Sequence, residues 1–135
     1  MLTQDPLLEK HRREEALSAT IAQIMALASG EQGDPSPTLA EGIRTTVQGL
    51  IGVEMSPDAI SQATRAAGDP GRVLSNATEQ ATYLTERGKD LVLRAAIAAA
   101  SAGTMDASRR ETLAEIGKRL GMMPAHVNGV LAEVA

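Results

Sequence analysis

The sequence contains no cysteine, no tryptophan and no phenylalanine, and Tyr83 is its single aromatic residue. Without cysteine the chain has no disulfide framework, thiolate zinc site, iron–sulfur cluster or cysteine nucleophile. Without a set of aromatic rings it has no platform on which the bases of single-stranded nucleic acid could stack. These absences exclude thiol chemistry and stacking of nucleic-acid bases as functions of the chain.

Long apolar runs are also missing. Residues 1–15 lack the apolar region of a signal peptide. The longest apolar stretch, 91–102, is interrupted by Arg94 and is too short to span a bilayer. We therefore expect a cytoplasmic protein.

The residues that are present favour a single all-α domain. The chain has 135 residues, a length typical of one domain, and its net charge is −4. Alanine, with 23 residues, supplies the largest share of the apolar set. Alanine is the strongest helix former and lets helix axes approach closely, whereas β-branched and aromatic residues are too sparse to build a sheet. We expect one domain over residues 1–135.

Proline and glycine divide this domain into seven expected helices. Five polar residues suit helix caps, and four of them stand directly before a proline, which is favoured at the first helical position. They are Asp5, Ser36, Ser56, Asp69 and Asp106. Glycine is expected to end helices near 30, 52, 68 and 121, and Gly88 to separate the fourth helix from the fifth. The helices are expected over about 6–30, 37–52, 57–68, 70–84, 89–102, 107–121 and 124–134.

The two halves of the chain, about 6–68 and 70–135, follow a similar order of elements. Each has an alanine-rich helix that ends in glycine, a polar loop, a helix with the letters TLAE, a glycine and a short helix that begins at proline. The letters TLAE stand at 38–41 and again at 112–115. Chance similarity between alanine-rich helices is the alternative. A duplicated unit is the better explanation, and it predicts a pseudo-two-fold arrangement.

The second half carries the letters ASAGTMDASRRETLAEIGKRLG, in which seven positions define a helix–loop–helix frame. They are Gly103, Met105, Asp106, Leu113, Ile116, Leu120 and Gly121. The first half follows the frame less closely, through Ala28, Gly30, Glu41 and residues 50–52. These positions, together with the duplicated and acidic arrangement of seven helices, make the chain resemble the tellurite-resistance TerB-like family. That family has a small all-α bacterial fold built from two similar halves.

The chain departs from this family's pattern at the carboxylates that would bind a divalent cation. The loop aspartate of the pattern falls on Ser29 in the first half and on Ala102 in the second. The acidic residue expected three positions after Asp106 is Arg109. The resemblance therefore implies the fold more directly than it implies a metal site.

Acidic residues in and near the loops remain the weak candidates for a divalent cation. Glu31, Asp34 and Glu41 belong to one set, and Asp106 and Glu111 to the other. Calcium or magnesium needs several converging oxygen ligands. Ordinary turn and cap chemistry accounts for the same residues, because Asp34 stands before a proline. We favour the turn and cap interpretation, expect no cofactor, and keep cation binding as an alternative function.

The C-terminal letters TLAEIGKRLGMMPAHVNGVL also suit a helix-turn-helix, with Gly121 at the turn and Val127 packing the second helix. From Pro124 onward, however, the second helix has no lysine or arginine and carries Glu133. Cationic side chains supply most of the affinity for phosphates and the commonest contact to guanine. We therefore do not expect nucleic acid as a partner, and a DNA-binding regulator stays an alternative.

Acid–base catalysis would depend on two histidines, His11 and His126. No carboxylate near His126 in sequence is placed to orient it, and the chain has no nucleophile elbow, phosphate loop or HExxH motif. His11 lies in the charged letters KHRREE, 10–15, whose i,i+4 pairs predict a solvated helical face.

We therefore expect a non-enzymatic interaction or scaffold module. The resemblance implies a role in tellurite or stress resistance at the cytoplasmic face of the membrane. It also implies a protein partner, including one associated with the membrane. A homodimer is a further alternative.

Overall fold

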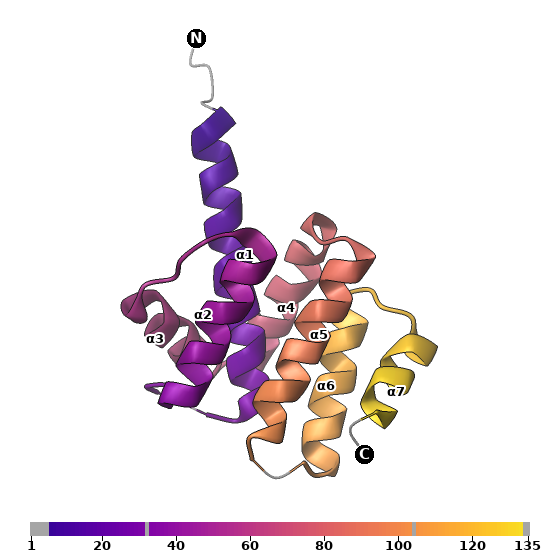
Figure 1. Cartoon of the computed structure of the whole chain (residues 1–135). Coiled ribbons are helices and arrows are strands. Elements are labelled where there is room, and N and C mark those ends of the chain that lie inside the picture. Colours follow the sequence, from indigo (N-terminus) through magenta and orange to yellow (C-terminus); the bar gives the residue numbers. More distant parts are fainter. Residues whose placement is uncertain (1–5, 32, 104, 134–135) are drawn as a thin grey trace.

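The computed structural model describes residues 6–31, 33–103 and 105–133, and over these residues the chain forms helices and loops without any strand (Figure 1). The seven α-helices are α1 (Pro6–Ser29), α2 (Pro37–Ile51), α3 (Pro57–Ala66), α4 (Pro70–Gln80), α5 (Glu86–Ser101), α6 (Ala107–Arg119) and α7 (Pro124–Ala132). A short 3₁₀ helix, η1 (Ala81–Tyr83), joins α4 to α5. The all-α prediction is confirmed. Asp5 and Val134, expected at the two ends of the helical set, lie outside the described residues.

Local capping explains where most helices begin. The side chains of Ser36, Ser56, Asp69 and Asp106 each accept a hydrogen bond from a backbone N–H in the first turn of the following helix, at 2.9–3.3 Å. Such bonds satisfy N–H groups that have no partner within the helix. At the other ends, Gly30, Gly52 and Gly121 adopt φ values of +77°, +77° and +79°. This left-handed conformation suits glycine because it has no Cβ.

The start of α5 differs from the sequence-based expectation. Gly88 does not separate two helices but lies inside α5, which begins at Glu86. The Thr85 hydroxyl caps this helix by accepting a hydrogen bond from the Gly88 N–H at 3.0 Å. A Cβ at Gly88 would stand 3.3 Å from a methyl carbon of Leu84. Glycine is therefore present for close packing, and α4 ends at Gln80 rather than near Leu84.

Helix α1 is the centre of the molecule. It packs against α2, α3, α4 and α5, while α6 packs against α4 and α5, and α7 packs on α6 (Figure 1). Both α1 and α5 bury alanines completely, including Ala22, Ala26, Ala96 and Ala100. Because α1 belongs to one half of the chain and contacts helices of both, residues 6–68 and 70–135 share one core. The pseudo-two-fold relation between the halves stays a prediction.

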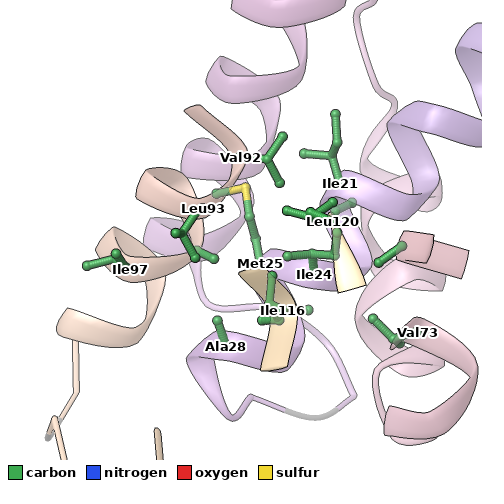
Figure 2. Close-up of a cluster of buried hydrophobic side chains, with 14 of the residues drawn as sticks. Ile21, Ile24, Met25, Ala28, Val73, Val92, Leu93, Ile97, Ile116 and Leu120 are labelled. Atoms are coloured by element: carbon green, nitrogen blue, oxygen red, sulfur yellow. The ribbon is translucent and has the colours of Figure 1, made fainter. Parts of the chain in front are cut away.

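All seven helices contribute apolar side chains to the core, and Figure 2 shows its central part. The labelled members are Ile21, Ile24, Met25 and Ala28 from α1, Val73 from α4, Val92, Leu93 and Ile97 from α5, Ile116 from α6, and Leu120 directly after α6. All of them are at most 4% exposed. Burying a Val, Leu, Ile or Met side chain contributes about 1.5–3 kcal/mol, so the larger members of the core stabilise the fold more than the small alanines do.

The first part of α1 leaves the bundle and projects into solvent (Figure 1). Leu17 is the first buried residue of the helix. Before it, Lys10 pairs with Glu14 at 3.8 Å, and His11 pairs with Glu15 at 4.0 Å. The predicted solvated helical face over 10–15 is therefore confirmed. Over the residues that the structure describes, no helix combines the length and apolar character needed to cross a membrane.

Candidate functional site

The acidic loop between α1 and α2 stabilises the start of α2. The Glu31 carboxylate accepts hydrogen bonds from the Ser36 N–H at 2.6 Å and from the Ser36 hydroxyl at 2.8 Å. Asp34 forms an ion pair with Arg65 of α3 at 3.1 Å. The two carboxylates thus have different partners and different structural roles. At the end of α1, the buried Ser29 hydroxyl donates to the Ala26 carbonyl at 2.7 Å and accepts from the Glu31 N–H at 3.1 Å.

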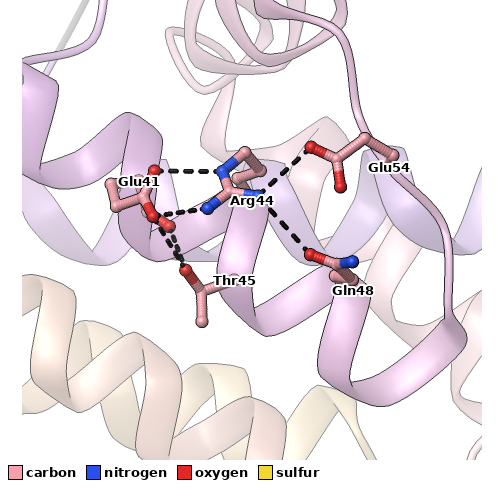
Figure 3. A network of polar contacts seen from close by, with 5 residues as sticks. All are labelled: Glu41, Arg44, Thr45, Gln48 and Glu54. Carbon is pink, nitrogen blue, oxygen red and sulfur yellow. Dashed lines mark hydrogen bonds and ion pairs between the residues drawn. The ribbon is translucent and has the colours of Figure 1, made fainter.

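Glu41 belongs to a separate network on the surface of α2 (Figure 3). Arg44 holds it in a two-pronged contact, with Nη2 to Oε1 at 2.6 Å and Nε to Oε2 at 3.0 Å. Arg44 also reaches Glu54 at 3.2 Å and Gln48 at 3.4 Å. The hydrogen bonds from Arg44 lower the pKa of Glu41, and those to Glu41 and Glu54 raise the pKa of Arg44. The network is solvated, so it contributes little to stability.

Asp106 and Glu111 also have different surroundings. Asp106 caps α6, with its carboxylate accepting from the Arg109 N–H at 2.9 Å. Glu111 lines a groove between α6 and α7. Over the described part of the chain, no three histidine, aspartate or glutamate side chains gather in a group that could hold a metal ion. The metal candidates therefore gain no support from the geometry.

A guanidinium lies at the junction where the family pattern expects an acid. The Arg109 Nη1 donates to the Ala100 carbonyl near the end of α5 at 2.6 Å. The same guanidinium stands so close to Gly103 that a Cβ there would lie 2.7 Å from Nη1, and it also borders Gly30. Arg109 thereby joins the ends of α1 and α5 to the start of α6. Its positive charge disfavours a divalent cation in this place.

His126 has the carboxylate partner that the sequence did not reveal. Its Nε2 lies 2.7 Å from Asp90 Oδ1, and Asp90 Oδ2 accepts from Arg94 at 2.8 Å. Arg94 continues to Glu133 at 2.8 Å. Hydrogen bonds from Arg94 and then from His126 lower the pKa of Asp90. The network joins α5 to α7. Over the described residues, no serine or threonine hydroxyl is hydrogen-bonded to His126.

One part of this network is readable in the sequence, and the other is not. Asp90 and Arg94 have the i,i+4 spacing of a helical ion pair. His126 stands 36 residues after Asp90. No local spacing rule connects them, because the contact depends on how α7 crosses the bundle.

The α6–α7 pair has the close packing of a helix-turn-helix but little positive charge on its second helix. A Cβ at Gly117 would stand 2.7 Å from a methyl carbon of Val127, so the two helices touch at this point. The letters of α7 contain no lysine or arginine. On α6, Arg119 is paired with Glu115 at 2.9 Å, which lowers the pKa of Glu115. These observations give the DNA-binding alternative no support.

Two apolar hollows are among the surface features that the sequence pattern does not predict. The first, which we call the α2–α5 hollow, has a volume of about 190 Å³. Small side chains form most of its walls, including Gly42 and Thr46 of α2 and Ala95, Ala98 and Ala99 of α5, with Ala102 after the helix. Met25 and Leu39 form apolar parts of the lining, and Glu31 and Ser36 form the polar part.

The second hollow, which we call the basal groove, lies where α1 leaves the bundle and has a volume of about 400 Å³. Its apolar lining consists of Leu17, Leu50, Ile51, Tyr83, Leu84 and Leu91. The Arg13 guanidinium lies over the Tyr83 ring, 5.3 Å from its centroid. Each lining residue is an ordinary part of a helix pattern in the sequence, and only the tertiary packing brings them together.

Comparisons with models of protein families, with curated proteins and with solved structures find no match for this chain. The assignment to a function therefore depends on the residues and the geometry described above.

Proposed function

We propose that this protein is a non-enzymatic helical interaction module of the TerB-like type, which binds a partner protein through the α2–α5 hollow. The hollow itself is the observation that carries the proposal. It is open, mainly apolar and lined mostly by small side chains, which do not fill it. Apolar concavities of this kind are typical binding sites.

The walls of the hollow favour a particular kind of occupant. Gly42 on α2 and Ala98 and Ala99 on α5 leave room for a bulky aliphatic side chain of a partner helix. At the polar end, Glu31 is half-buried and accepts two hydrogen bonds from Ser36. A carboxylate has about four lone-pair sites, so Glu31 retains capacity for a lysine or arginine of the partner. The proposed partner therefore presents a bulky apolar residue followed by a basic one.

The family resemblance supplies the proposed setting. The positions of the second-half frame perform roles that suit a helix–loop–helix unit: Asp106 caps α6, Leu113 and Ile116 are completely buried, and Gly121 has a left-handed backbone. These roles support the TerB-like proposal. In that setting the partner is a protein at the cytoplasmic face of the membrane, and the process is tellurite or stress resistance.

A substitution that fills the hollow tests this function. Ala98 is exposed, so Ala98→Trp places a large ring in the hollow without entering the core. Cells of the source organism that lack the gene would receive the unmodified protein, Ala98→Trp or the matched surface control Ala125→Trp. We expect Ala98→Trp alone to fail to restore survival on tellurite, although its circular dichroism and thermal midpoint stay unchanged. Full restoration by a folded Ala98→Trp variant would contradict the proposal.

A further inference from the structure

The projecting end of α1 carries exposed apolar side chains. Leu7 is 76% exposed and Leu8 is 47% exposed. They stand in the first turn of a helix that extends well beyond the rest of the molecule (Figure 1). We call residues 6–9 the tip. Solvated leucines at the end of a projecting helix form a surface suited to insertion into an apolar groove.

The basal groove offers such a surface at the other end of the projecting segment. Tyr83 is 53% exposed and Leu91 is 39% exposed, and both line this groove. Of the five large hydrophobic side chains that are exposed in the described part of the chain, two belong to the tip and two to the basal groove. The remaining one, Met123, lies on the turn between α6 and α7.

The geometry of α1 keeps the tip away from the groove of its own chain. Leu7 and Leu17 are ten residues apart in one continuous helix, which corresponds to about 15 Å at 1.5 Å per residue. A second copy in antiparallel orientation would place its tip at this groove and receive the first tip in its own. Such an arrangement has two-fold symmetry, so it closes with both tips and both grooves occupied.

The charges around the tip and the groove favour a second copy as the occupant. The tip carries Glu9, while Arg13 lies over Tyr83 and Arg87 lines the groove. Neither arginine takes part in an ion pair among the described residues. An antiparallel partner would therefore bring a carboxylate to an unpaired cation. The segment 9–15 holds three acidic residues and three lysines or arginines, which gives no net repulsion between copies and no net attraction to an anionic membrane.

We propose that this protein forms a two-fold dimer in which the tip of each α1 occupies the basal groove of the other chain. The dimer leaves the α2–α5 hollow of each chain in place, because the two hollows have different lining residues. The dimer therefore presents two hollows, and two linked sites raise the avidity for a partner that has two copies of the motif.

Molar mass by light scattering after size exclusion tests the dimer across a range of concentrations. We expect the unmodified protein to have the mass of two chains. Both Leu7→Glu with Leu8→Glu and the groove variant Leu91→Glu are expected to have the mass of one chain, with unchanged circular dichroism. Met123→Glu, which alters an exposed residue outside both surfaces, is the matched control and stays dimeric.

Cysteine cross-linking tests the pairing itself, because the native chain has no cysteine. A mixture of Leu8→Cys and Leu91→Cys proteins is expected to form a disulfide between chains, whereas a mixture of Leu8→Cys and Met123→Cys is not. A single-chain mass for the unmodified protein at every concentration would overturn the dimer, as would a dimer that persists in the tip variant. If the tip variant stays dimeric but no longer binds vesicles, the tip is a membrane contact and not a dimer contact. None of these results bears on the hollow, whose test uses Ala98→Trp.

Discussion

Glycine has opposite roles at two positions of the α6–α7 pair. Gly117 of α6 is buried beneath Val127, whereas Gly129 of α7 has no atom within 4 Å of the place where a Cβ would lie. At the first position the missing side chain permits helix contact. At the second it only increases the freedom of the unfolded chain, which lowers stability.

Gly117→Ala is therefore expected to lower the free energy of unfolding by about 1–3 kcal/mol, the cost typical of an overpacked contact. The added methyl would stand 2.7 Å from Val127, which is too close for a relaxed contact. Val127→Ala in the same chain should recover part of the loss. Gly129→Ala is the matched control and is expected to stabilise by about 0.5–1 kcal/mol. Urea unfolding measures all four proteins, and equal effects of the two glycine substitutions would contradict the contact.

Asp90 gives the contact between α5 and α7 a dependence on pH. Its pKa is lowered mainly by the hydrogen bond from Arg94 and less by the one from His126. At pH values near the ordinary pKa of an aspartate, the native state therefore binds fewer protons than the unfolded chain. The stabilisation by ionised Asp90 is complete at pH values above the ordinary aspartate pKa, and it is lost as the pH falls through the lowered pKa of the native state. Asp90→Asn should remove this contribution, so the two thermal midpoints should differ at neutral pH and converge in acid.

Thermal unfolding between neutral pH and strong acid measures this convergence. Asp58→Asn is the control, because Asp58 is an exposed carboxylate of α3 with no ion pair among the described residues. A constant difference between Asp90→Asn and the unmodified protein at every pH would show that the Asp90 contacts do not act through its ionisation.

At the scale of the elements, helix α2 depends on a small set of polar contacts at its start. Ser36 caps the helix through the Leu39 N–H at 3.2 Å and also donates its hydroxyl to Glu31. One side chain thus holds both the first turn and the preceding loop. The same residues form the polar end of the α2–α5 hollow.

Ser36→Ala is expected to lower the free energy of unfolding by about 0.5–2 kcal/mol, as is usual for loss of an N-cap. Ser108→Ala is the matched control, since Ser108 is exposed within α6 and its hydroxyl makes no hydrogen bond among the described residues. Urea unfolding compares the two variants. Hydrogen exchange should also speed up at the start of α2, and an unchanged rate there would argue against the cap.

At the scale of the whole molecule, α1 joins the two stretches that the sequence pattern separates. Its buried side contacts helices on both sides of residue 69. Ile24 is 1% exposed in this shared core. Single domains below about 150 residues usually unfold in one cooperative transition, and a shared core requires it here.

Ile24→Ala is accordingly expected to destabilise the entire molecule by about 2–5 kcal/mol, because it removes buried methyl groups and leaves a cavity. Unfolding followed by circular dichroism and by Tyr83 fluorescence should show one coincident transition that shifts as a whole. Leu8→Ala, at an exposed position of the tip, should leave the transition unchanged at a protein concentration too low for association. Two separate transitions would instead indicate halves with independent cores.

Local features of the sequence were enough to predict the helices. Ser36, Asp106 and Gly52 act on backbone groups within a few residues of themselves, and the alanine content favours helix throughout. Where a residue acts on one that is distant in the chain, as Asp90 does on His126, no local pattern predicts the contact. Gly88 is a local exception: glycine in the sequence predicts a helix break there, whereas the turn between α4 and α5 packs Leu84 against Gly88 inside α5.

The candidate sites show the same difference between local contacts, which the sequence predicts, and long-range contacts, which it does not. Four of the five acidic residues nominated for a metal have other partners, as Glu31 has in Ser36 and Asp34 in Arg65, and the fifth, Glu111, lines the α6–α7 groove. The α2–α5 hollow and the basal groove have walls from helices far apart in the chain. The helices follow from the sequence alone, because capping and helix propensity are local. Which apolar surfaces stay exposed depends on the packing of the whole chain, because an apolar side chain is buried or exposed according to the helices that cover it.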